Sequence, residues 1–322
     1  MHQKVSAIPN LYGLELVHNS PARPGVISIN ETSGKVSIIG NADGIPILPA
    51  CGDLIALDSK RDLLYYLGDT AEGTTLAGVH LSNGTLSCTT ILPIKEIGFV
   101  GFGQSVNFDV AADELIISGV IVNATTNATA HLVLKGPAEN CGPFSILGKF
   151  GDADFVPMEH ASAYDPVTRR LFVGLATSST SFAVGVIDVV TGKLEKVDVE
   201  NSASGKFLVG MKWHAKSNTL IGLENYPDYN TLNLVQLSPI TGKWTVTETS
   251  TDFPVLMGNS GSVSALDSLS DNLFILLAEN TTSQDIRLGR LSISTAKITQ
   301  TPSINGELGL GLISSIIIPD ES

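Results

Sequence analysis

The residues with the clearest potential for chemistry are carboxylates in short polar segments between apolar runs. Gly151-Asp152-Ala153-Asp154 places two carboxylates at alternate positions, a spacing found in calcium-binding loops. Ca²⁺ takes six to eight oxygen ligands, so this pair alone would supply only part of a site. The sequence therefore predicts either no cofactor or a Ca²⁺ ion.

The other motifs that could mark an active site are incomplete. Gly258-Asn259-Ser260-Gly261-Ser262 lacks the last glycine of a nucleophile elbow, and no Walker loop or HExxH motif occurs. The six histidines are scattered, and we expect His160 and His214 to be hydrogen-bonded structural residues. The sequence thus predicts no catalytic residue.

Charge and composition exclude several classes of protein. With 19 Lys and Arg against 32 Asp and Glu, the formal net charge is −13, which disfavours binding to nucleic-acid phosphates. The 43% hydrophobic content is enough for a large core, and no apolar run is long enough to span a membrane.

Five Asn-x-Ser/Thr sequons indicate a secreted glycoprotein, because glycosylation requires exposed loops in a secreted chain. Residues 1–9 lack the apolar centre of a signal peptide, so the chain is either cytosolic or has lost a signal that preceded this numbering. We expect secretion. The predicted glycosylation sites are Asn30, Asn83, Asn123, Asn127 and Asn280.

A repeat of about 50 to 55 residues organises the chain, and it must position these residues. Each copy has an apolar run that ends at a polar residue, a short turn and a second apolar run. Residues 53–58 with 63–68 and residues 160–165 with 171–176 are the clearest examples. A hairpin follows, with a left-handed turn position at Gly34, Gly84, Gly192 and Gly242, and at Ala296 in the last copy.

Four short strands per repeat and about six repeats predict an all-β fold, a six-bladed β-propeller. The C-terminal segment resembles the first strand of a repeat and the N-terminal segment resembles a second strand. We therefore expect residues 312–318 to pair with residues 11–16 and close the ring. The prediction is a single domain over residues 1–322.

This pattern resembles six-bladed propellers of the lactonase-like, NHL-like and YVTN-like kind over the whole chain, without matching one characterised family. Lactonase-like propellers centre a Ca²⁺ ion near the axis on Glu, Asn and Asp. By position, the resemblance implies Glu159, Asn225 and Asp53 as ligands here.

The three cysteines allow at most one internal disulfide. Cys88 and Cys141 fall on the outer hairpins of the second and third repeats, which neighbouring blades bring together. We therefore predict a Cys88–Cys141 bridge and a free Cys51.

The predicted ring has two unlike faces. Segments that enter the first strand, or join the second and third strands, carry fifteen acidic residues and only three basic ones. The turns at the opposite face carry eleven of the nineteen basic residues and about as many acidic ones, so most of the net negative charge falls on one face. The favoured hypothesis is a secreted, non-catalytic binding or structural protein that associates head to tail with itself or binds another extracellular protein. The alternative is a Ca²⁺-dependent lactonase-like hydrolase at the acidic mouth of the channel.

Overall fold

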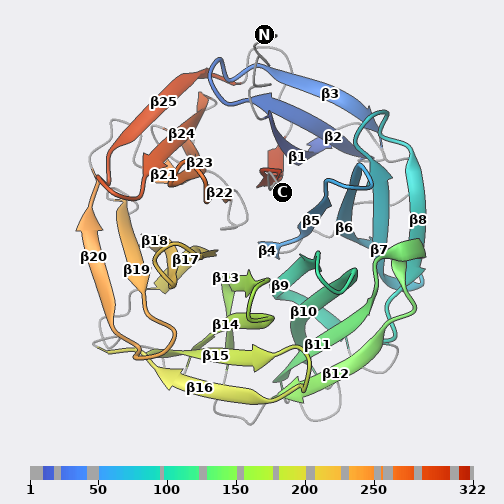
Figure 1. The fold of residues 1–322 in the computed structure, drawn as a ribbon. Helices are drawn as coiled ribbons and strands as arrows, with labels where there is room; N and C mark the ends of the chain where they lie inside the picture. The colour runs from blue at the N-terminus through green and yellow to red at the C-terminus, as the bar shows by residue number, and fades with distance from the viewer. Residues whose placement is uncertain are drawn as a thin grey trace, which may run out of the picture.

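Six antiparallel β-sheets are arranged as blades around a central axis, which confirms the six-bladed propeller (Figure 1). The computed structural model describes residues 10–17, 23–41, 51–94, 98–122, 129–150, 156–176, 181–200, 207–225, 232–249, 255–256, 264–278, 285–304 and 312–319. Within these residues no helix has the length and apolarity that a membrane crossing requires. That residues 1–322 form one domain stays a prediction.

Each blade has four main strands, ordered from the axis outward. Blade 1 contains β26 (Leu312–Ile317), β1 (Asn10–Val17), β2 (Arg23–Asn30) and β3 (Val36–Asn41). Blade 2 contains β5 (Ile55–Asp58), β6 (Leu63–Thr70), β7 (Gly73–His80) and β8 (Leu86–Ile91). Blade 3 contains β9 (Gly98–Asp109), β10 (Glu114–Val122), β11 (Thr129–Pro137) and β12 (Ser145–Phe150), with the short 3₁₀ helix η1 (Glu139–Cys141) before β12.

The other three blades repeat this order. Blade 4 contains β13 (Val156–Asp165), β14 (Arg170–Ala176), β15 (Phe182–Asp188) and β16 (Leu194–Asp198). Blade 5 contains β17 (Phe207–His214), β18 (Thr219–Asn225), β19 (Asn233–Leu237) and β20 (Trp244–Glu248). In blade 6, β21 (Val255–Leu256) and β22 (Ser264–Asp267) both pair with β23 (Asn272–Ala278), and β24 (Ile286–Ser292) and β25 (Ile298–Ser303) follow.

The ring closes as predicted, because β26 forms the innermost strand of the N-terminal blade. It pairs antiparallel with β1 in a register that joins Tyr12 to Ile317 and Leu16 to Leu312. In Figure 1 the C-terminus accordingly lies close to the axis.

The core lies between neighbouring blades, and we call each such interface a seam, named by its two blades. The middle strands are buried on both sides, and every residue of β23 is buried. This explains why these strands are continuous apolar runs rather than alternating patterns. The seam that closes the ring, seam 6–1, contains residues such as Leu11, Phe274 and Ile316.

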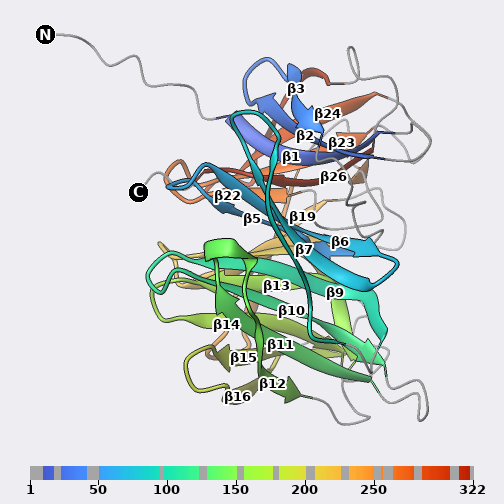
Figure 2. The same cartoon turned by 90° about the vertical axis from the view of Figure 1, so that its right-hand side faces the viewer.

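The two faces of the ring differ in how the strands are connected. On one face, which we call the turn face, short hairpin turns join the first strand to the second and the third to the fourth (left in Figure 2). The other face is the loop face. At the predicted left-handed positions of the outer hairpins, Gly34, Gly84, Gly192 and Gly242 have φ of +70°, +67°, +74° and +70°, and Ala296 has φ of +53°.

Candidate functional site

The inner strands line the axis, and one of them crosses between blades. β4 (Cys51–Asp53) pairs in parallel with β9 of blade 3, and joins Cys51 to Phe102 and Asp53 to Ser105, whereas β5 pairs within blade 2. Residues 51–53 and 98–104 thus belong to strands, although the glycines in both segments are typical of loops. Gly101 and Gly103 lie on β9 on either side of Phe102, the residue that pairs with Cys51.

The predicted calcium ligands fall partly on these strands. Asp53 ends β4, Glu159 lies within β13, and Asn225 ends β18, but their side chains are outside what the structure describes. Asp152 and Asp154 lie outside the described residues altogether. β4 contacts both β9 and β13, so the backbones of Asp53 and Glu159 lie on neighbouring strands. The calcium site itself stays a prediction.

On the turn face, the inner hairpins share one backbone geometry. The last residue of the first strand accepts hydrogen bonds from the turn: Asp58 Oδ1 accepts from the backbone N–H groups of Lys60 and Arg61, each at 3.1 Å. The residue before the second strand is left-handed in five blades, with φ between +52° and +59°. Those residues are Asp62, Asp113, Arg169, Asn218 and Asp271.

Two arginines of these turns bind carboxylates of a neighbouring blade. In seam 2–3, Arg61 Nη1 donates to Asp113 Oδ1 and to Asp58 Oδ2, each at 2.6 Å, and its Nη2 also contacts Asp113. The hydrogen bonds from Arg61 lower the pKa of Asp113 below its usual value. In seam 3–4, Arg169 Nε donates to the buried Asp109 at 2.6 Å.

A second feature of the turn face is a set of exposed aliphatic tips. Their side chains are among the most exposed large hydrophobic ones that the structure describes, and they belong to hairpins of blades 3 to 6. Exposed basic residues follow two of them in the sequence, Arg170 three residues after Val167 and Lys243 three residues after Ile240. The tip residues, with their exposed fractions, are Val110 (62%), Val167 (82%), Val190 (57%), Ile240 (75%) and Leu269 (70%).

Two predicted glycosylation sites lie in outer hairpin turns on the turn face. Asn83 is exposed, and its Oδ1 accepts hydrogen bonds from Thr85 N at 2.9 Å and Thr85 Oγ1 at 2.7 Å. Asn30 is partly buried, and its Oδ1 accepts from Thr32 N at 3.1 Å and Ser33 N at 2.8 Å. Asn123, Asn127 and Asn280 lie outside the described residues.

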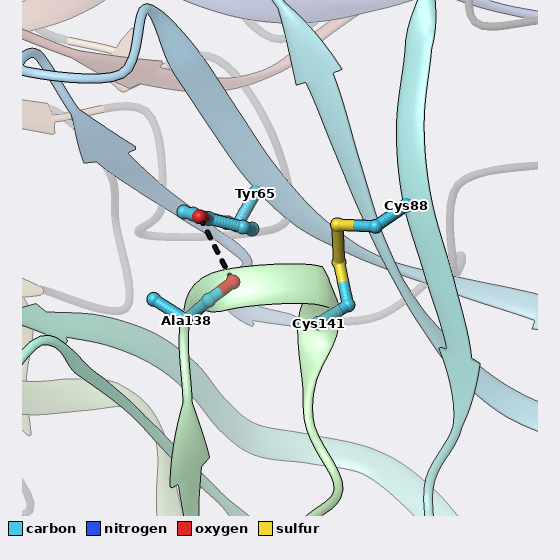
Figure 3. Close-up of a disulfide and its surroundings, with 4 residues drawn as sticks. All are labelled: Tyr65, Cys88, Ala138 and Cys141. Atoms are coloured by element: carbon cyan, nitrogen blue, oxygen red, sulfur yellow. Dashed lines mark hydrogen bonds between the residues drawn. A yellow bond between two sulfur atoms is a disulfide. The ribbon is translucent and has the colours of Figure 1, made fainter.

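The predicted Cys88–Cys141 disulfide is confirmed, and it links blades 2 and 3 across their seam (Figure 3). The two Cα atoms are 5.7 Å apart, and Cys141 is fully buried in η1. Beside the bridge, the Tyr65 hydroxyl donates to the Ala138 carbonyl oxygen at 3.2 Å. Burial raises the pKa of Tyr65 to about 12, so this hydroxyl remains a donor at physiological pH.

Comparisons with known proteins agree on the fold and go no further. No protein-family model and no curated protein matches the chain. Among solved structures, TolB from Acinetobacter baumannii is 12% identical with a TM-score of 0.60, over 96% of this chain and 66% of TolB. A periplasmic gluconolactonase from Pseudomonas aeruginosa is 14% identical with a TM-score of 0.52, over 93% and 80%. An oligogalacturonate lyase from Vibrio parahaemolyticus is 11% identical with a TM-score of 0.52, over 87% and 71%.

Proposed function

We propose that the protein is a secreted, non-catalytic propeller that acts as an extracellular binding or structural and assembly protein. The Cys88–Cys141 disulfide is the observation that carries this proposal. Such bridges persist in oxidising compartments and are rare in the cytosol. The exposed Asn83 sequon is consistent with the same compartment.

The partner that fits the turn face best is the acidic loop-face sequence of a second copy. The aliphatic tips offer apolar contact area, and Arg170 and Lys243 add positive charge around them. The sequence segments that precede a first strand, or join a second strand to a third, are rich in Asp and Glu and poor in Lys and Arg. Unlike faces meet head to tail, and such a contact forms a ring or a filament. Opposite charges across it would fix orientation more than affinity.

Light scattering over a salt series tests this contact. We expect association at low salt and weaker association near 1 M salt, where the Debye length falls to about 3 Å. Ile240→Ser, on the turn face, should weaken association, whereas Ile146→Ser, on the outer strand β12, is the matched control. A monomer at low salt and high concentration would contradict the contact.

Secretion is tested separately in a eukaryotic secretory host. Peptide mapping without reduction should recover the Cys88–Cys141 linkage from the secreted protein. Asn83→Gln should remove one glycosidase-sensitive mass step, if Asn83 carries a glycan. Retention of the chain in the cytosol with both thiols reduced would overturn the proposed location.

The lactonase-like hydrolase is the second candidate. The observation that favours it is the crossing strand β4, which brings Asp53 next to β9 and close to β13, where Glu159 lies. A bound metal there would polarise an ester carbonyl. Metal analysis of the purified protein separates the candidates, because one tightly bound Ca²⁺ per chain favours the hydrolase and its loss in Asp53→Asn would place the ion at β4.

A further inference from the structure

The inner hairpin of blade 5 departs from a cap that two other blades share. In blade 4 the Thr168 hydroxyl donates to Asp165, and in blade 6 the Ser270 hydroxyl donates to Asp267. In blade 5 the same two positions hold His214 and Ser217. A carboxylate that only accepts is thus replaced by an imidazole that can exchange a proton.

The His214 ring joins a serine to a carboxylate. Its Nδ1 lies 2.7 Å from Ser217 Oγ, and its Nε2 lies 3.0 Å from Oδ1 of Asp271, which belongs to the turn of blade 6. The ring is buried, whereas Ser217 is exposed at the surface of the turn face. An exposed hydroxyl is therefore held against a histidine that is almost completely covered by the protein.

Charges around the ring set its proton positions. Lys216 binds the other oxygen of Asp271, and the hydrogen bonds from Lys216 and His214 lower the pKa of Asp271. An ionised carboxylate only accepts, so the Nε2 atom that faces it carries a hydrogen, and the Nδ1 atom is the one that can accept from Ser217. Ser217 Oγ is also 2.6 Å from Thr219 Oγ1, whose hydroxyl can donate to it.

The turn that carries Ser217 also lacks a backbone tie found in other blades. In blades 4 and 6, Val189 N donates to Arg169 O at 3.1 Å and Ile293 N donates to Asp271 O at 2.9 Å. The corresponding residue of blade 5 is Pro239, which has no N–H. The hydrogen bonds of His214 to Ser217 and Asp271 thus link this turn to blade 6 at a place where the tie to the outer hairpin is absent.

We propose that Ser217 is a nucleophilic serine, with His214 as its general base and Asp271 as a positioning residue. This adds an esterase site to the binding or structural role proposed above and replaces its non-catalytic character. Serine, histidine and carboxylate in this order form the arrangement that activates a hydroxyl. Because Ser217 lies on an exposed turn, the substrates it fits are small esters with a good leaving group, such as aryl esters of short acids.

The reaction on such an ester balances with these residues alone. Ser217 Oγ bonds to the carbonyl carbon as its proton moves to His214 Nδ1. The carbon–oxygen bond to the aryl group then breaks, and the leaving oxygen takes that proton. Water next attacks the acyl group on Ser217 and gives a proton to His214, which returns it to Oγ as the carboxylic acid leaves.

Labelling of the full chain with an alkyl fluorophosphonate tests the proposal. Ser217 Oγ would form a bond to phosphorus, fluoride would leave, and His214 would take the proton. We expect peptide mass spectrometry to find the label on Ser217 at least ten times faster than on Ser270, the matched serine of blade 6 that faces Asp267. Ser217→Ala should remove the label, and the same variant should lose hydrolysis of an aryl acetate.

Two further variants separate activation from folding. His214→Gln should lower the labelling rate at least tenfold and abolish its dependence on pH. Asp271→Asn keeps a residue that tolerates the left-handed backbone, so the melting temperature should change little. The labelling rate of Ser217 should nevertheless fall. Equal labelling of Ser217 and Ser270, or full labelling in a folded His214→Gln protein, would overturn the proposal.

Discussion

Seam 2–3 and seam 6–1 hold the same ring together by different means. Seam 2–3 has a disulfide, a two-oxygen ion pair between Arg61 and Asp113, and an apolar core. Seam 6–1 contains an apolar cluster, and beside it the chain ends meet through the pairing of β26 with β1. The Cys88–Cys141 disulfide is thus not at the point where the ring closes. Strand pairing and buried apolar side chains hold the closure. The closure should therefore be the part of the ring most sensitive to removal of terminal residues.

Removal of residues 313–322 is expected to have the largest effect. It would leave β1 as an open edge and uncover the apolar side chains that Ile316 and Ile318 now cover. We expect poor soluble expression, or a melting temperature lower by at least about 10 °C. Thermal melts should compare this truncation with a chain that ends at Pro319, which retains β26. Equal melting of both chains would show that closure contributes little.

Loss of the disulfide comes next. The bridge closes a loop of 53 residues, so the Cys88→Ala/Cys141→Ala double variant should lose about 2–4 kcal/mol of unfolding free energy. Urea unfolding of the variant and of the oxidised protein would measure the loss. The fold and the ring closure should survive, because the seam keeps its apolar core. A loss larger than that of the truncation would reverse the ranking of the two seams.

Seam 4–5 extends the comparison to a contact that depends on glycine. Gly242 has φ of +70°, and a Cβ atom there would lie 1.9 Å from the Asp198 carbonyl oxygen of the preceding blade. Gly242→Ala should therefore cost at least about 2 kcal/mol, from left-handed strain and from displacement of the neighbouring backbone. Gly73→Ala is a useful control in urea unfolding, because Gly73 also has positive φ but its nearest atom would be Ile91 Cγ2 at 3.8 Å. Equal losses of unfolding free energy in the two variants would mean that backbone strain alone accounts for the effect, without the contact to Asp198.

Seam 3–4 should respond to acid. His131 lies two residues before Val133 on β11, so both side chains point to the same face of the strand, and Val133 belongs to the apolar cluster of this seam. The ring nitrogens of His131 have no hydrogen-bond partner within the described residues. Burial lowers the pKa of His131 to about 4 from 6.5. The unfolded chain therefore binds the proton more readily, and stability is lost as pH falls from about 6.5 towards 4. The loss is roughly 2 kcal/mol at pH 5.

His131→Met would separate the stability lost through protonation of His131 from the stability lost through titration of carboxylates. The variant should lose less stability than the natural chain between pH 7 and pH 5, in urea unfolding followed at several pH values. Parallel pH profiles for the two proteins would show that His131 is not protonated on unfolding.

The sequence was informative where one repeat determines the structure, and less so where two repeats meet. Turn glycines and apolar runs are local, so the blade count, the closure of 312–318 on 11–16 and the Cys88–Cys141 bridge could be predicted. Arg61 and Asp113 are 52 residues apart, and only the ring geometry brings them together. The crossing of β4 to β9 was missed because the glycines there look like a loop. His214 was expected to be structural, and the partner Asp271 from blade 6 was missed for the same reason as Asp113.

A substitution in seam 5–6 should have the smallest effect on stability, and it tests the same turn position that Gly242 occupies in blade 5. Ala296 occupies the same turn position with φ of +53°, and its methyl group is buried in the apolar cluster of this seam. Ala296→Gly would relieve about 1 kcal/mol of left-handed strain. It would also remove a buried methyl group, worth about 0.8 kcal/mol, and give the unfolded chain more freedom. These terms oppose each other, so we expect urea unfolding to shift by no more than about 0.5 kcal/mol. A loss above about 1.5 kcal/mol would mean that the Ala296 methyl group stabilises seam 5–6 far more than its area predicts, and that this turn has been remodelled around a side chain the other blades exclude.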